Sequence, residues 1–503
     1  MNLRPENIPV IVGTGEITHR TKELDRGIEP IDLMAGALRE AERDAGAALL
    51  ARLDSLDMVL ERSWPYPDPC TLIEGRLGVK PARNVYGPTG GESPVRHIQE
   101  AALRIARGES RVAGVTGGEA RYTVEAANKA GVALPWSERE PVSPTPVAAA
   151  FLHEVAVAHG MFLPIYLYPL YENASHAAWG QTPREAMAES ALLWSRYSEV
   201  AATNPYAWLK KTYSPAQIGE ATADNRLIAW PYTKHMVANP LVNMGAAVLM
   251  TSLGVARELG IPEERLVYVW GGAQASEPRD ILARDQYARS HAQDLVMETI
   301  LAQAGGDASA FSMLELYSCF PVVPKMARRT LGLAADARMT STGGLSFFGA
   351  PLNNYMTHAA AGLVRALRED RGKLALLYGQ GEFVTKHHAL VLASKPPSPD
   401  ALREDYSVQT AADARRAAVP PVVAEHNGAA TLETFTVVYE RDGTPNRGVV
   451  IGRTPGGARL MARVDAAETA TLAQLTALER SPVGSRGEVS KGQDGLLRWK
   501  ASA

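Results

Sequence analysis

The chain has 503 residues, 46% of them hydrophobic and 21% charged, which excludes a disordered protein and predicts about two to four domains. With 52 Lys and Arg against 55 Asp and Glu, the formal net charge is -3, and no basic tract is dense enough for nucleic-acid binding. Two cysteines are too few for a disulfide framework, so we expect a cytoplasmic protein. The sequence contains neither an export signal nor an apolar run of about 18 residues, so we expect no membrane anchor.

The chain opens in an α/β pattern. Residues 8–16, IPVIVGTGE, predict a buried strand that ends in a glycine turn, and the stretch from Ile31 to about Ala45 has the period of a helix. The glycine turn is not a dinucleotide fingerprint, because Thr18 stands where the third glycine would be. We therefore expect no nucleotide redox cofactor.

An internal repeat is the most informative feature of the sequence. Residues 90–123 and 348–385 each predict a loop, a helix, a strand and a second loop, in that order. A glycine loop with Pro94 or Pro351 opens each helix, and each strand ends in a glycine-rich segment that contains a glutamate. Two similar halves bring two helix N-termini to one centre, which suits a thioester carbonyl or an enolate oxygen.

Composition divides the rest of the chain. Residues 134–240 are rich in Pro, Tyr and Trp and predict a long loop domain, and prolines after Leu392 indicate a linker. Short β-type runs follow, with one helix near residues 467–479, which predicts a five-stranded barrel of oligonucleotide-binding type. That barrel type also serves as an interaction module, so it does not by itself imply nucleic acid.

The predicted domains follow from these boundaries. We expect an N-terminal half over 1–265 that includes the loop domain at about 134–240, a C-terminal half over 266–395, a linker over 396–430 and the small β-barrel over 431–503. Histidine pairs offer no metal site. His153 and His159 are six residues apart and would lie on different faces of a helix, and adjacent histidines in a strand point to opposite sides.

Several motifs resemble the thiolase superfamily. Gly343-Gly344 is followed four residues later by Gly349-Ala350-Pro351, where thiolases carry Gly-Gly and Gly-His-Pro, and residues 315–320, ELYSCF, resemble the preceding loop. Residues 90–108 have the length and helix phase of the thiolase nucleophile segment. The resemblance implies two βαβαβαββ halves in five layers, α/β/α/β/α, with a loop domain. With the C-terminal barrel, the chain looks most like the thiolase-like proteins of type 1, often labelled acetyl-CoA acetyltransferases.

The residues that perform thiolase chemistry are nevertheless changed. The nucleophilic cysteine position falls on Gly91, and only the serine of Cys-x-Ser is kept, as Ser93. The histidine becomes Ala350, the second cysteine loop becomes Gly379-Gln380-Gly381, and the loop asparagine becomes Tyr317. Without thiolate and histidine base, double-displacement thiolysis should fail.

Other nucleophiles are weak candidates. Cys319 lies beside Phe320 in the same loop, and packing is its more common role there. Ser93 and His97 are four residues apart at a helix start and could face each other, although a hydrolase also needs an orienting carboxylate.

Tyrosine offers a different chemistry. Tyr317 faces the substrate carbonyl by resemblance, and as a base it needs its pKa, about 10 in water, to fall by a few units. Some thiolase-superfamily aldolases of steroid side-chain degradation are similar in relying on tyrosines and in working with a module of oligonucleotide-binding fold. The predicted catalytic residues are Tyr317, Ser93, Gln380 and Tyr355.

The resemblance implies a CoA thioester as substrate or ligand, near Gly344, Gly349 and Gly381, without a metal. We carry two functions forward. The first is an enzyme that makes or breaks a carbon-carbon bond next to the thioester, in a retro-aldol-like reaction without a cysteine nucleophile. The second is a catalytically inactive protein that binds CoA or acyl-CoA. The partner is expected to be a small-molecule acyl-CoA, and the protein a monomer or homodimer.

Overall fold

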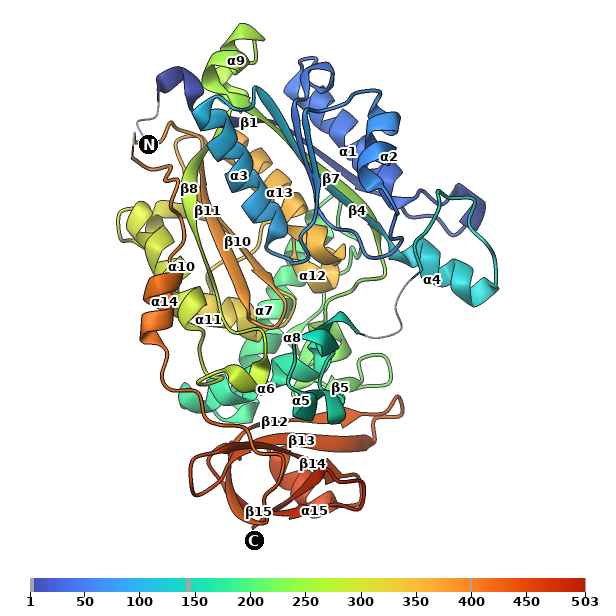
Figure 1. The fold of residues 1–503 in the computed structure, drawn as a ribbon, viewed down its shortest axis with the longest axis vertical. Coiled ribbons are helices and arrows are strands. Elements are labelled where there is room, and N and C mark those ends of the chain that lie inside the picture. Colours follow the sequence, from blue (N-terminus) through green and yellow to red (C-terminus); the bar gives the residue numbers. More distant parts are fainter. Residues whose placement is uncertain (1–3, 142–145, 399, 503) are drawn as a thin grey trace.

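The computed structural model describes residues 4–141, 146–398 and 400–502, and its centre is a nine-stranded mixed sheet (Figure 1). The strand order is β3-β2-β4-β7-β1-β8-β11-β10-β9. In the first half lie β1 (Pro9–Thr18), β2 (Ser55–Met58), β3 (Arg83–Tyr86), β4 (Val112–Ala120) and β7 (Asn243–Ser252). In the second half lie β8 (Val267–Ser276), β9 (Phe311–Leu316), β10 (Leu374–Gly381) and β11 (Lys386–Ala393). The halves repeat one order and meet where β1 pairs briefly with β8.

Two central helices lie between the halves. They are α3 (Ser93–Arg107) and α13 (Tyr355–Glu369), which contact each other and strands of both halves (Figure 1). Ala359, Ala360 and Ala361 of α13 are fully buried, because a helix covered on both sides by sheet has room only for small side chains.

Outer helices complete the layers. Helix α1 (Pro30–Ala45) packs on β1, β4 and β7, with α2 (Pro69–Leu77) beside it, and the short α9 (Leu253–Glu258) lies near the first strands. On the other side α10 (His291–Gln303) packs on β8 and β11, with α11 (Val322–Thr330) against it. Close approach explains Gly13 in β1, since a Cβ there would fall 3.0 Å from the Ala41 carbonyl carbon in α1. The five-layered α/β/α/β/α fold predicted from the sequence is confirmed.

The segment predicted as a loop domain consists mainly of helices. They are α5 (Glu154–Ala158), α6 (Pro164–Ala178), α7 (Pro183–Thr203) and α8 (Pro215–Gly219), followed by the strands β5 (Leu227–Ala229) and β6 (Tyr232–Thr233), and α4 (Arg121–Ala130) precedes the segment. Its prolines open helices rather than mark loops: Pro164, Pro183 and Pro215 each occupy a first helical position, where no backbone N–H is needed. Capping boxes at Thr182 and Ser214 satisfy further free amides.

The C-terminal strands pair in the order β13-β14-β16-β15-β12, and β12 also pairs with β13, which closes the barrel. They are β12 (Gly428–Tyr439), β13 (Pro445–Arg453), β14 (Arg459–Asp465), β15 (Arg486–Lys491) and β16 (Leu497–Ala501). Helix α15 (Thr469–Leu475) lies inside the range predicted for it. The proline-rich stretch before the barrel holds α14 (Gln409–Arg415), which packs on α10 and β8.

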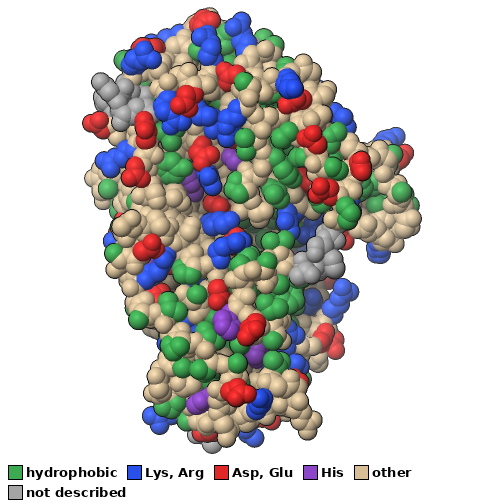
Figure 2. All heavy atoms as spheres, viewed as in Figure 1, with side chains coloured by type: hydrophobic (Ala, Val, Ile, Leu, Met, Phe, Trp, Pro, Cys, Tyr) green, Lys and Arg blue, Asp and Glu red, His purple; other side chains and the backbone are tan. Residues whose placement is uncertain are grey.

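The barrel rests on the helical insertion (Figure 1). Asn173 Nδ2 of α6 donates to the Phe435 carbonyl oxygen at 2.8 Å, and the backbone of Trp230 donates to that of Val437 at 2.8 Å. These bonds join the barrel to the insertion that covers the core. Figure 2 shows side chains of both charge signs interspersed over this face of the molecule. Over the described residues we find no helix that combines the length and apolarity needed to span a bilayer.

Candidate active site

The loop before α3 contains Gly91, where the sequence predicts the position of the missing thiolase nucleophile. A Cβ on Gly91 would lie 2.7 Å from Tyr317 Cζ, 2.5 Å from the Gln380 carbonyl oxygen, and closer still to the Tyr317 hydroxyl. Non-bonded carbon atoms prefer about 3.5 to 4.0 Å, so no side chain fits here without displacing Tyr317. The phenol therefore occupies the space in which a nucleophile side chain would begin.

Tyr317 directly follows β9 and is held by its backbone and by its ring. Its N–H donates to the Tyr378 carbonyl oxygen at 3.1 Å, and its ring stands edge-on to that of Tyr355, with centroids 5.9 Å apart. The residue is 7% exposed. Burial raises the pKa of Tyr317 well above its ordinary value. This is opposite to the depression that a base requires, so the phenol stays neutral and can donate a hydrogen bond.

Gln380 also lies beside Gly91, and hydrogen bonds hold its side chain in one orientation. Tyr168 Oη of α6 lies 2.7 Å from Gln380 Oε1, and Gln380 Nε2 donates to the Gly381 carbonyl oxygen at 2.6 Å. Cys319 Sγ is 3.6 Å from the same Oε1, and burial raises the pKa of this thiol to about 12. A protonated thiol is a poor nucleophile, so Cys319 is not poised for acyl transfer. Tyr168 belongs to an aromatic run of the insertion, and its sequence spacing does not indicate that it reaches this site.

Ser93 and Tyr355, two of the predicted catalytic residues, are both fully buried, and Ser93 is described first. Ser93, the first residue of α3, is fully buried, and no described residue bonds its Oγ. His97 does not form the considered dyad with it: His97 Nδ1 lies 3.6 Å from Asp57 Oδ1 instead. Burial lowers the pKa of His97.

The hydroxyl of Tyr355 hydrogen-bonds to Glu315 and to a neighbouring loop at Thr342. Its hydroxyl lies 2.6 Å from Glu315 Oε1 and 2.5 Å from Thr342 Oγ1. The same Glu315 accepts from the backbone of Ser341 at 2.8 Å and of Thr342 at 3.1 Å. This network shapes the segment that leads into Gly343-Gly344, so the hydroxyl of Tyr355 is already engaged.

Glu92 is a site residue that the sequence reasoning did not identify. It lies beside Gly91, is 7% exposed, and its Oε2 is buried without a hydrogen-bond partner among the described residues. Burial raises its pKa to about 7, opposed mainly by the positive charge of Lys386. The available signal was an acidic residue directly after a glycine pair at a helix start, a pattern too common to single out.

Strained backbone concentrates around the same centre. Among the described residues, non-glycine residues with positive φ are Leu352 at 44°, Glu382 at 58° and Val384 at 51°. Leu352 follows the Ala350-Pro351 loop, and the other two lie in the turn after Gly381. Glu382 is held there by ion pairs with Arg279 at 2.8 Å and with Lys386 at 2.9 Å. Such strain persists where the surroundings enforce it and is typical of functional sites.

Backbone conformation and close packing already account for glycine at the positions predicted to line a thioester. Gly344 and Gly349 have φ of 76° and 117°, and a Cβ on Gly349 would lie 2.9 Å from Val242 Cγ1. A Cβ on Gly381 would meet the Glu92 carboxylate, with 2.9 Å to its Cδ. Contact of these glycines with a ligand stays a prediction.

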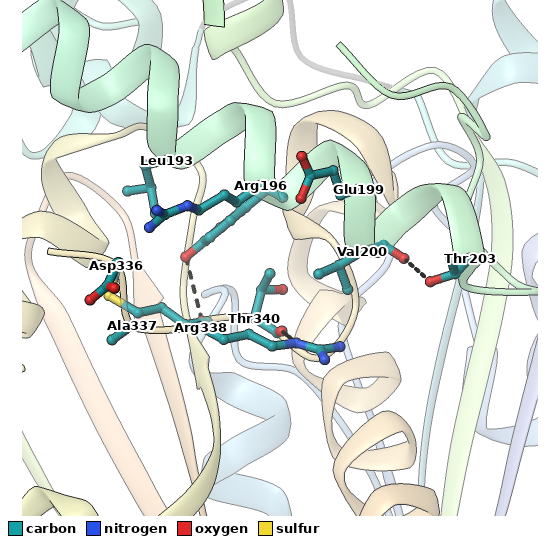
Figure 3. A pocket seen from close by; sticks show the side chains of 11 residues that line it. Leu193, Arg196, Glu199, Val200, Thr203, Asp336, Ala337, Arg338 and Thr340 are labelled. Atoms are coloured by element: carbon teal, nitrogen blue, oxygen red, sulfur yellow. Dashed lines mark hydrogen bonds between the residues drawn. The ribbon is translucent and has the colours of Figure 1, made fainter. Parts of the chain in front are cut away.

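A separate cavity of about 370 Å³ lies between α7 and residues 336–340 (Figure 3). Arg196 and Glu199 project into it from the helix, opposite Asp336 and Arg338. None of the sequence-predicted site residues lines it. The described residues also contain no group of three or more His, Cys, Asp or Glu arranged to hold a metal ion.

Comparisons with known proteins agree with this architecture. Residues 408–495 match a family model described as the thiolase-like protein type 1 additional C-terminal domain. The crystal structure of a monomeric SCP2-thiolase like protein type 1 from Mycobacterium smegmatis is 30% identical, with a TM-score of 0.83, over 99% of this chain and 100% of that one. No curated protein sequence matches the chain.

More distant structures share the fold. The Ltp2-ChsH2(DUF35) aldolase is 18% identical with a TM-score of 0.59, over 78% of this chain and 98% of that one. Human mitochondrial 3-ketoacyl-CoA thiolase in complex with CoA is 15% identical with a TM-score of 0.56, over 78% of this chain and 100% of that one.

Proposed function

The chain belongs to the SCP2-thiolase-like proteins of type 1, and from this premise we propose that it makes or breaks a carbon-carbon bond next to a CoA thioester without forming an acyl-enzyme. The observation that carries the proposal is the replacement at the nucleophile position. Tyr317 fills the space beside Gly91, so a donor stands where a thiolate would attack. The site has kept a polar group at the reacting centre while losing the means to hold an acyl group covalently.

The chemistry that suits these groups is aldol-type cleavage or its reverse. Retro-aldol cleavage of a 3-hydroxyacyl-CoA needs a base for the hydroxyl proton and donors for the enolate oxygen, and no covalent intermediate. A neutral Tyr317 can donate to that oxygen, and the N-terminus of α3 adds a positive dipole end. Thiolysis has no matching groups, since Cys319 stays protonated and Ala350 replaces the histidine.

Fold relatives support acyl-CoA as the ligand class. One distant relative is an aldolase and another was solved with CoA, and both align over most of their own length. We propose a CoA thioester as substrate, the cytoplasm as the setting because Cys70 and Cys319 are free thiols, and a monomer like the 30%-identical relative.

The test is product analysis by mass spectrometry. The protein is incubated with a panel of 3-hydroxyacyl-CoA and 3-ketoacyl-CoA thioesters, alongside Tyr317→Phe and the control Tyr406→Phe, whose partner Glu100 lies on α3 away from Gly91. Cleavage of hydroxyacyl substrates to a shorter acyl-CoA and a carbonyl compound is expected. Loss of the oxyanion donor should lower kcat by about 100-fold or more in Tyr317→Phe, and the control should keep wild-type activity.

Two outcomes would contradict the proposal. Thiolysis of 3-ketoacyl-CoA with free CoA would show that an acyl-enzyme forms after all. An inert panel combined with measurable CoA binding would favour the second function, a binding protein without catalysis.

A further inference from the structure

We propose that Glu92 is the catalytic base and acid of this site, taking a proton from the substrate's 3-hydroxyl and later returning it to the acyl carbon. This inference rests on the function proposed above and names the group that moves the proton. Tyr317 then acts only as a hydrogen-bond donor. The division of roles differs from the sequence-based expectation, in which Tyr317 was the acid/base.

The Glu92 carboxylate packs against two glycines, Gly90 and Gly381. A Cβ on Gly90 would lie 2.5 Å from Glu92 Oε1, and a Cβ on Gly381 would lie 2.9 Å from Glu92 Cδ. Only residues without side chains leave room for the carboxylate between these two loops. Glu92 immediately precedes α3, yet its side chain makes no capping hydrogen bond to that helix. The carboxylate is therefore held at the centre of the site without serving the helix.

No Lys, Arg or His of the described residues forms an ion pair with the carboxylate. Lys386, whose positive charge opposes the raised pKa of Glu92 most strongly, pairs with Glu382 at 2.9 Å and donates to the Thr89 carbonyl oxygen at 2.9 Å. A buried carboxylate without a partner is costly, so its retention calls for a role beyond packing. The titratable groups that face Glu92 from the surrounding elements are Lys386, Glu382, Arg96, Tyr317 and Tyr378. Burial outweighs these charges and leaves the pKa of Glu92 at about 7, where a base is most effective at neutral pH.

Residual exposure separates Glu92 from the other candidates. Glu92 and Tyr317 are each 7% exposed, whereas Ser93, Gln380 and Tyr355 are fully buried. Glu92 directly follows Gly91, and a Cβ on Gly91 would lie 2.7 Å from Tyr317 Cζ, so the two residues flank the same glycine. One carboxylate and one phenol, neither of them fully buried, thus lie next to Gly91.

The reaction balances with these two groups. The Glu92 carboxylate removes the proton of the 3-hydroxyl, the C3–O bond becomes a carbonyl, and the C2–C3 bond breaks with its electron pair moving into the thioester as an enolate. Tyr317 donates to the enolate oxygen. The protonated Glu92 then gives its proton to C2, which releases a shorter acyl-CoA beside the aldehyde or ketone. The carboxylate is regenerated, and neither an oxidant nor a further reactant is needed.

The experiment measures two reactions over a range of pH. One is cleavage of the 3-hydroxyacyl-CoA panel, and the other is exchange of C2 hydrogens of acetyl- and propionyl-CoA in D₂O, read by mass spectrometry. The wild type should gain activity as pH rises to about 7 and then level off, because the base must be ionised. Glu92→Gln should lose at least about 100-fold in both reactions, and Glu92→Asp should recover part of it. Tyr317→Phe should be slower with the same pH profile.

The control is Glu100→Gln on the same helix, where Glu100 pairs with Arg96 at the surface. Binding of CoA to each variant, measured by calorimetry, separates lost chemistry from lost folding. Unchanged cleavage in Glu92→Gln would overturn the role of Glu92 while leaving the proposed function intact. Exchange without cleavage, abolished in Glu92→Gln, would support Glu92 and reject the cleavage reaction. A wild type that neither cleaves nor exchanges would overturn both.

Discussion

Replacing Glu92 with Gln is expected to stabilise the protein at pH 8 and to change it little at pH 5. The reason is the buried carboxyl without a hydrogen-bond partner at Oε2. Burial raises the folded-state pKa of Glu92 from its ordinary 4.5 to about 7, so between these pH values the folded state keeps a proton that the unfolded state releases. The wild type therefore loses stability as pH rises from 4.5 to about 7 and stays level above that.

The structure sets the size of this effect. The interval between 4.5 and about 7 corresponds to about 3 kcal/mol of folding free energy at pH 8. At pH 5 most of this cost is absent, and the expected difference is less than about 1 kcal/mol. Gln is a neutral amide of similar shape, so any constant effect of the substitution cancels when the two pH values are compared.

Urea unfolding of wild type and Glu92→Gln at pH 5, 6, 7 and 8 measures the difference directly. Glu488→Gln, an exposed change on β15, is the control and should show no pH-dependent gain. A gain for Glu92→Gln that grows with pH is the expected result. If Glu92→Gln is destabilised equally at every pH, Glu92 is ionised and paired in the folded protein, and the reasoning about its burial is refuted.

Two further changes test the packing of the site. Gly91→Ala should lower the free energy of unfolding in urea by about 1 to 3 kcal/mol, because the new Cβ overlaps Tyr317. The control Gly75→Ala, where a Cβ would meet no atom within 4 Å, should not destabilise the protein, and equal effects of the two changes would contradict the overlap. Tyr355→Phe should lower the free energy of unfolding by about 1 to 3 kcal/mol, because Glu315 loses a buried hydrogen-bond donor. The measurement is the thermal unfolding midpoint, and an unchanged midpoint would show that this hydrogen bond contributes nothing to stability.

Much of the fold could be predicted from local patterns. The repeat of residues 90–123 in 348–385 corresponds to the two central helices and the strands that follow them, because hydrophobic period and glycine spacing are local properties. The barrel helix also lies where it was expected. The insertion was less predictable, since prolines that suggest a loop also open helices, as Pro183 does in α7.

The site itself depended on the tertiary structure. From the sequence, Tyr317 was the expected acid/base and Tyr355 a further candidate. Only the fold shows that Glu315 engages Tyr355 while Tyr317 lies against Gly91. Glu92 carried no distinguishing signal in the sequence, because its properties arise from burial among loops of both halves.

The sequence by itself determined the thiolase-like fold, and it led to the expectation that the thiolase nucleophile and base are absent. These follow from residue types at given spacings, which a single chain displays directly. The tertiary structure decided which phenol is available, that its pKa rises rather than falls, and that Glu92 Oε2 is buried without a hydrogen-bond partner among the described residues. Each of these depends on how far solvent is excluded and on which distant groups come together, and no local pattern records either.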